Sequence, residues 1–100
     1  MDSFTVSVYI GLIMLKVVGK TENGNKFRPS AWAEMLVEGV GLTHFGYDHK
    51  IHYLSGVDIG YSESDSTTFI ILDDSVKTNH REAYDYILDF ASANKLQIFF

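Results

Sequence analysis

The sequence predicts an α+β fold, a split βαβ-like (βαββαβ) sandwich with two helices on one face of a mostly antiparallel sheet. The order of the expected elements follows the split βαβ plan. That plan places the first and third strands in the centre of the sheet, and the two most apolar strand segments, residues 10–18 and 67–72, take those positions. The more polar segment 49–54 suits the remaining edge.

The first strand is expected within residues 10–18, which are rich in β-branched side chains. A turn should follow at residues 21–25, because Asn and Gly tolerate positive φ and Asn-Gly is a strong hairpin signal. We therefore expect the chain to fold back briefly through Lys26 and Phe27.

A first helix is expected over residues 31–40. Pro29 disfavours helix before it, Ser30 is a good N-cap residue, and Gly39-Val40-Gly41 marks the end. The apolar stripe recurs at helical spacing in Trp32, Met35, Leu36 and Val40. We expect Trp32 to be buried against the second helix and the sheet.

The second helix is the clearest element of the sequence. Asn79 with Glu82 three residues later resembles a capping box, and Lys95 suits the negative end of the helix dipole. Its apolar stripe consists of Ala83, Tyr86, Ile87, Phe90, Ala91 and Asn94.

The remaining segments complete the sheet. Residues 57–61 are expected as an irregular extension of the strand at 49–54, and residues 96–100 as the final strand. The apolar run 67–72 predicts a strand buried on both faces. It stops at Asp73-Asp74, where we expect a turn or a helix cap rather than a catalytic pair of carboxylates.

The chain has 100 residues, enough for one domain, which we assign to residues 14–100. Residues 1–13 are expected as an apolar N-terminal extension or as the first part of strand 1. Residues 3–15 carry no charge but fall short of the roughly 20 residues that span a bilayer. Asp2 also replaces the basic start of a signal peptide, so no membrane association is expected, although an uncleaved leader or a start at Met14 stays open.

The net charge of −5 is concentrated in the second half of the chain. Residues 1–50 hold five basic and five acidic residues, whereas residues 51–100 hold three basic and eight acidic ones. Nucleic-acid binding depends on clustered Lys and Arg, so this pattern argues against it. The sequence has 0 Cys, which excludes disulfides and thiolate chemistry and suits a cytoplasmic location.

Four possible metal ligands, His44, Asp48, His49 and His52, lie within nine residues. On a strand, His49 and His52 would point to opposite faces, and no metalloprotease motif is present. We therefore expect no metal and no cofactor, and keep His49 and His52 only as weak candidates for ligand binding.

Arg28 and Ser30 form the most interesting polar spot. A helix N-terminus exposes free N–H groups that can hold an anion, and Arg28 beside it would strengthen such a site. The alternative is that Arg28 pairs with an acidic neighbour and Ser30 merely caps the helix. No nucleophile elbow and no phosphate loop occur, so no catalytic residue is assigned.

Three stretches of the sequence stand out together: Phe27 to Glu34, the Phe45-Gly46 step, and Ala83 to Gln97. They resemble a family of small, mainly proteobacterial proteins that is classed as a domain of unknown function. The family pattern is Phe-Arg-Pro-Ser-Asp-Trp-Ala-Glu, and this chain departs from it at Ala31. The resemblance implies a bacterial cytoplasmic protein and supplies no activity, cofactor or site residue.

Two classes of function follow. The first is a non-catalytic interaction or regulatory module that self-associates, because apolar strand material at both ends of the chain exceeds what a small sheet can bury. We expect a homodimer formed through sheet edges or the uncovered sheet face, and a different protein partner stays open. The second class is a small enzyme or a binding protein for an anion or carboxylate, with its site near Arg28 and Ser30.

Overall fold

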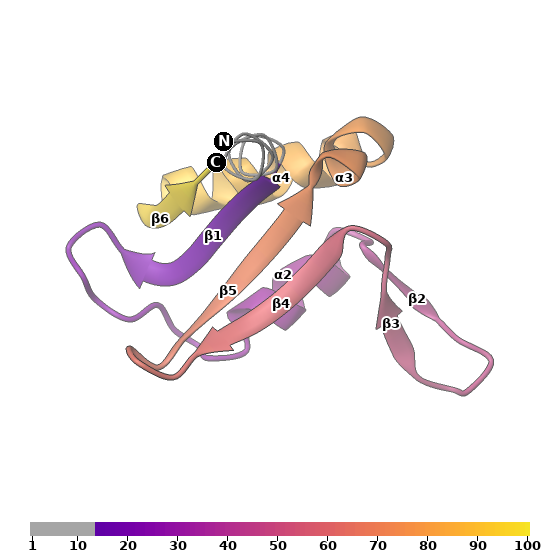
Figure 1. Cartoon of the computed structure of the whole chain (residues 1–100), viewed down its shortest axis with the longest axis horizontal. Coiled ribbons are helices and arrows are strands. Elements are labelled where there is room, and N and C mark those ends of the chain that lie inside the picture. The colour runs from indigo at the N-terminus through magenta and orange to yellow at the C-terminus, as the bar shows by residue number, and fades with distance from the viewer. Residues whose placement is uncertain (1–13) are drawn as a thin grey trace, which may run out of the picture.

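A computed structural model describes residues 14–100, and the part of the predicted first strand before Met14 lies outside the described residues (Figure 1). One sheet has the order β4-β5-β1-β6, formed by Val57–Ser62, Thr67–Asp73, Met14–Thr21 and Leu96–Phe99, and every neighbouring pair is antiparallel. The two apolar strands β1 and β5 are central, as the sequence predicts. The α+β fold class is thus confirmed.

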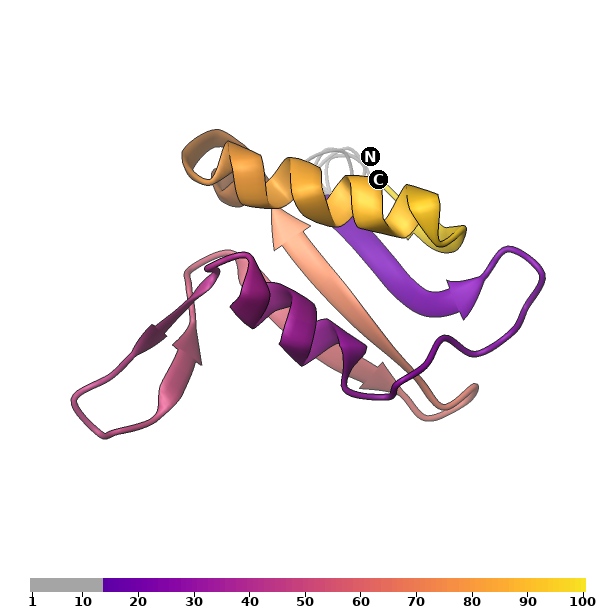
Figure 2. The ribbon, with the colours of Figure 1, turned by 180° about the vertical axis from the view of Figure 1, so that it is seen from behind.

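Helices α2 (Trp32–Gly39) and α4 (Arg81–Ala93) cover the same face of this sheet (Figure 2). The core lies between them and the sheet. Its fully buried members come from both layers: Leu15, Val17, Ile70 and Leu72 from the strands, with Ala33, Val37, Ile87 and Ala91 from the helices. These are the inward positions of a two-residue strand period and a 3.6-residue helix period.

The turn after β1 forms as the sequence predicts. Gly24 has a φ of 86°, and Lys20 and Lys26 form an antiparallel bridge. Gly41, with a φ of 82°, follows the end of α2, where a left-handed residue is common. Local turn chemistry therefore sets both of these chain reversals.

The second strand of the main sheet differs from the prediction. Residues 57–61, expected as an irregular extension, belong to the edge strand β4 (Val57–Ser62), in which Val57 and Ile59 alternate inward opposite Leu72 and Ile70. Residues 51–53 instead form β3 (Ile51–Tyr53), which pairs with β2 (Thr43–Phe45) in a separate hairpin. The break at Gly56, whose φ is 88°, redirects the chain between the two sheets.

The start of the second helix also differs. Asp73 caps an additional helix, α3 (Asp74–Asn79), by accepting a hydrogen bond from the Ser75 backbone N–H at 2.9 Å. The expected role of Asp73 as a cap is confirmed. Asn79 therefore ends a helix rather than capping one, and α4 begins after His80, whose φ of −135° interrupts the helical path.

Within residues 14–100, no helix covers the other face of the sheet. Phe69 and Ile71 of β5 point to this face and are half-buried, so the prediction that β5 is buried on both faces is wrong. The Phe69 ring lies against Gly60 of β4, and the Lys16 ammonium lies 4.5 Å from its centre. Ring, glycine and lysine stem together shield part of this face from water.

Candidate functional site

The segment before α2 places Arg28 and Ser30 at the surface, and both are exposed. Ser30 does not cap the helix: the N-cap residue is Ala31, which makes no side-chain capping hydrogen bond. The first turn is closed by backbone instead, with the Trp32 N–H donating to the Pro29 carbonyl at 3.0 Å. The prediction that Ser30 caps the first helix is therefore wrong.

Trp32 lies in a cluster of three aromatic rings, with only 4% of its surface exposed. The centre of its ring lies 5.7 Å from that of Phe27 and 6.4 Å from that of Phe90, and Phe27 and Phe90 are 5.9 Å apart. The indole also lies against Gly19 of β1. The predicted burial of Trp32 against α4 and the sheet is confirmed.

A hollow of about 260 Å³ opens beside this cluster. Its apolar lining consists of Phe27, Pro29, Trp32, Met35, Leu36 and Phe90. Arg28 is the one charged residue of that lining. Within residues 14–100, no carboxylate lies within 4 Å of the Arg28 guanidinium, so the expected alternative of an acidic partner is not seen there.

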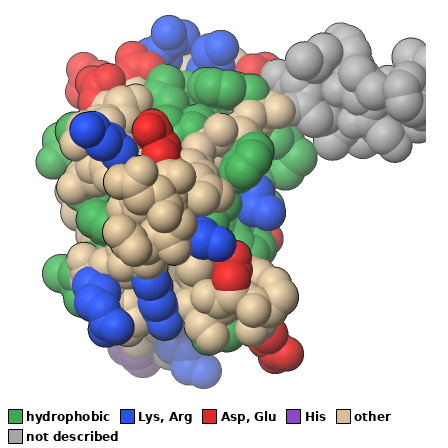
Figure 3. Space-filling view, turned by 90° about the vertical axis from the view of Figure 1, so that its left-hand side faces the viewer, with side chains coloured by type: hydrophobic (Ala, Val, Ile, Leu, Met, Phe, Trp, Pro, Cys, Tyr) green, Lys and Arg blue, Asp and Glu red, His purple; other side chains and the backbone are tan. Residues whose placement is uncertain are grey.

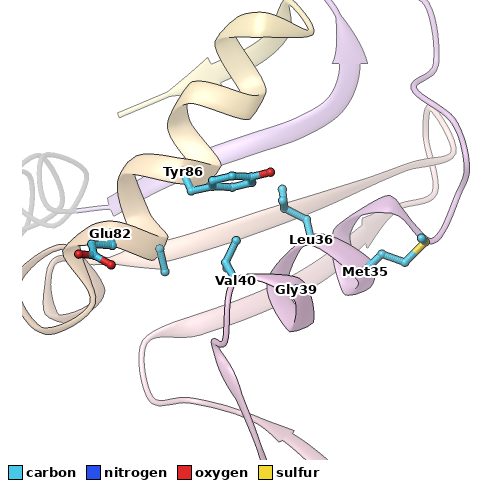
Figure 4. A pocket seen from close by; sticks show the side chains of 7 residues that line it. Met35, Leu36, Gly39, Val40, Glu82 and Tyr86 are labelled. Carbon is cyan, nitrogen blue, oxygen red and sulfur yellow. The ribbon is translucent and has the colours of Figure 1, made fainter.

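A second hollow of about 440 Å³ continues from the first between the two helices (Figure 4). Met35 and Leu36 line both hollows, so we call the pair the α2–α4 groove. The second hollow is completed by Val40, Ala83, Tyr86 and Glu82, and Tyr86 of α4 lies opposite Leu36 of α2 in Figure 4. The groove thus has Arg28 at one end and Glu82 at the other.

The groove accounts for the exposure of Met35 and Tyr86, the two exposed apolar residues of the predicted stripes. Met35 is 64% exposed and Tyr86 is 58% exposed. Both lie on the outer edge of their stripe, beyond the line where α2 and α4 meet the core. In the sequence, the apolar stripes of the two helices contain more residues than the core can bury. Which of these residues remain exposed depends on the distance between the helices, and the sequence does not give that distance.

The β2–β3 hairpin carries His49 and His52, and both are exposed. His52 Nε2 lies 2.9 Å from both carboxylate oxygens of Asp48, and the His44 ring is stacked on that of His52 at 5.5 Å. The hydrogen bond from His52 is the main cause that lowers the pKa of Asp48 below its ordinary value. His49 instead lies edge-on to Phe45, at 6.1 Å.

These polar groups do not form a metal centre. Across residues 14–100, no three His, Asp or Glu side chains are arranged to hold a metal ion. The hairpin follows the C-terminal end of α2, whereas Arg28 precedes its N-terminal end, so the structure does not bring Arg28 and the two histidines together. The four predicted site residues therefore belong to two separate places.

The hairpin also exposes large apolar side chains. The cross-strand pair Phe45 and Ile51 is 67% and 54% exposed, and Tyr47 and Tyr53 are exposed as well. Figures 1 and 2 both show the hairpin projecting from the four-stranded sheet. Each strand has only three residues, and an isolated two-stranded hairpin is marginally stable in water.

The end of the molecule that carries the 21–25 turn presents charges of both signs (Figure 3). Lys and Arg side chains are interspersed there with acidic ones, and Lys20 Nζ lies 3.9 Å from the Asp65 carboxylate. Charges mixed in this way give little long-range attraction for a polyanion. None of the described helices is both long enough and apolar enough to cross a membrane.

Residues 13–99 match a protein family described as "Protein of unknown function (DUF3579)". The chain belongs to this family. A solved structure described as the solution structure of its family's first structural representative has the same fold, with a TM-score of 0.73 and 25% sequence identity. The similarity covers 87% of this chain and 77% of the other. No curated protein is significantly similar to this DUF3579 chain.

Proposed function

We propose that this DUF3579 protein is a non-catalytic interaction module that self-associates as a homodimer. The observation that carries the proposal is the β2–β3 hairpin, whose strands are too short to be stable alone and which exposes Phe45, Tyr47, Ile51 and Tyr53. Exposed apolar patches on a projecting element are typical of protein–protein contacts.

The hairpin adds little to the core of its own chain. The Leu54 N–H donates to the Leu42 carbonyl at 3.0 Å, which closes the base of the hairpin, and Leu42 is fully buried. Beyond this base, every residue from His44 to Tyr53 except Gly46 is exposed. The exposure of its apolar side chains supports a role of the hairpin in contacts outside the chain.

A second copy of the chain is the partner that best suits such an element. If binding of a partner stabilises the hairpin, that partner has to be present whenever the protein is folded. Another copy of the same chain meets this requirement. Two-fold symmetry requires only one self-complementary surface. A stable interface should bury more than about 1,000 Å² in total.

The open edge of β6 offers a second surface for the same assembly. Phe99 and Phe100 are exposed, and among the described strands β6 pairs only with β1. Edge strands leave backbone N–H and C=O groups free to pair with another copy. This supports the expectation that dimerisation uses a sheet edge.

Light scattering coupled to size-exclusion chromatography tests the proposal. We expect about twice the chain mass of 11.3 kDa at high micromolar concentration. Ile51→Lys should give monomers if the hairpin forms the interface, and Phe99→Lys should do so if the β6 edge forms it. Tyr61→Lys is the matched control, since Tyr61 is 58% exposed on the opposite edge strand β4. A wild-type monomer under these conditions would refute the proposal.

We propose further that the protein is bacterial and cytoplasmic and acts as a regulatory module. The resemblance to a proteobacterial family and the composition of 0 Cys support the location.

We also propose that Phe-Arg-Pro-Ser-x-Trp-Ala-Glu is a general motif of DUF3579, because Phe27 and Trp32 build the aromatic cluster. Other sequences of the family test this directly.

A further inference from the structure

We propose that the α2–α4 groove binds an apolar carboxylate, with the carboxylate at Arg28 and the apolar part along the groove toward Tyr86. The groove contains hollows of about 260 and 440 Å³ that meet at Met35 and Leu36. Together they reach the size of ordinary small-molecule sites, which are mostly apolar with a few placed polar groups.

The charges at the two ends give the ligand a direction. Arg28 is the one charged residue that lines the first hollow, and Glu82 is the one charged residue that lines the second. A guanidinium binds a carboxylate through charge-assisted hydrogen bonds, whereas Glu82 repels it. A negatively charged head group is therefore favoured only at the Arg28 end.

The floor of the groove suits an acyl or aromatic tail. Beside Arg28 lies the cluster of Phe27, Trp32 and Phe90, whose rings are 5.7 to 6.4 Å apart and offer a rigid apolar surface. From Phe90 the groove follows α4 back to Ala83, a step of about 10 Å at the rise of a helix. An extended medium-length acyl chain spans this distance.

Decanoate is the probe that we would use, at concentrations below its self-aggregation. Trp32 is the one tryptophan of the chain and lines the groove, so its fluorescence reports occupancy directly. We expect a saturable change with decanoate. Decanol, which lacks the charge, should bind at least about tenfold more weakly, since a hydrogen bond to a charged group contributes about this factor. Acetate, which lacks the tail, should give no saturation in the same range.

Two variants separate the guanidinium from general electrostatics. Arg28→Gln should weaken decanoate binding about tenfold and leave decanol binding unchanged. Lys26→Gln is the matched control, because Lys26 is an exposed cation two residues away that does not line either hollow. Circular dichroism and urea unfolding confirm that both variants fold.

Several results would overturn the proposal. They are no saturable change with decanoate, equal affinities for decanoate and decanol, or equal losses from Arg28→Gln and Lys26→Gln. Light scattering during the titration separates this site from the proposed dimer. We expect an unchanged mass, whereas dissociation on adding decanoate would mean that a second copy occupies the groove and that the ligand assignment is wrong. A monomeric wild-type chain that still binds decanoate would refute only the proposed self-association.

Discussion

Replacing Trp32 with Ala tests whether the contact between α2, α4 and β1 holds the domain together. Trp32 is 4% exposed and touches both Phe27 and Phe90, so its removal empties the junction of the helical layer with the sheet. Large-to-small changes of a buried Trp cost about 3–5 kcal/mol. Because the 260 Å³ hollow adjoins the indole, neighbouring side chains can partly collapse, and we expect the lower part of that range, about 3 kcal/mol.

The loss is measurable because small domains are stable by only about 5–15 kcal/mol. Urea unfolding followed by far-ultraviolet circular dichroism is the assay, since the variant has no tryptophan signal. The midpoint should fall while the denaturant slope stays the same. Met35→Ala is the control: Met35 is 64% exposed on the same helix and should cost below about 1 kcal/mol. A loss below about 1 kcal/mol for Trp32→Ala would refute the reasoning and would make Trp32 a binding residue rather than a core residue.

Three further predictions concern other parts of the chain. Gly19→Ala should destabilise the protein by about 1–3 kcal/mol in urea unfolding, because the new Cβ would lie 2.5 Å from Nε1 of Trp32. Asp73→Ala removes the cap of α3 and should cost about 1 kcal/mol, measured by thermal unfolding, whereas Asp73→Asn should cost less. The folded-state pKa of Asp48 is lowered, so its bond to His52 stabilises the hairpin above the ordinary pKa of 3.8 and is lost as the pH falls through the lowered value. Chemical shifts of the hairpin followed by NMR should show this transition, and Asp48→Asn should abolish it.

The sequence predicted the central part of the fold because the signals there are local and agree with one another. The two most apolar, β-branched segments are residues 10–18 and 67–72. The described central strands, Met14–Thr21 and Thr67–Asp73, overlap these two segments. The turn at residues 21–25 and the stripe of α4 follow rules that need only a few neighbouring residues. The order of the strands in the sheet was predicted from the βαββαβ order of elements along the chain, and not from any single residue.

The edge strand β4 could not be found in the same way, because strand pairing depends on residues far away in the chain. Residues 57–62 do alternate apolar and polar, but Gly60 weakened the pattern as a sequence signal. In the structure, the Phe69 ring from the neighbouring strand lies on Gly60 and fills the space of the missing side chain. Aromatic cover of a strand glycine is a property of the paired strands, so one strand alone does not reveal it.

The candidate site also has one part that local sequence signals predict and another part that depends on residues far apart in the chain. Arg28 was identified from its place before a helix, and the structure does put it at the rim of a hollow. The partners that make the place a groove, Phe90 and Tyr86, come from a helix more than fifty residues later. Ser30 was predicted from capping statistics, but backbone groups close the first turn of α2 without it.

The two outward-facing features are supported by the fold in different ways. The α2–α4 groove is built on the core: its floor residue Trp32 is also a main contact between helix and sheet, so the core fixes the floor of the groove. The hairpin is attached through Leu42 and Leu54 at its base and carries exposed apolar side chains beyond it. A rigid groove favours a small, shape-matched ligand, whereas a projecting hairpin gains stability from whatever covers it. This difference is the physical reason for assigning the ligand to the groove and the second copy of the chain to the hairpin.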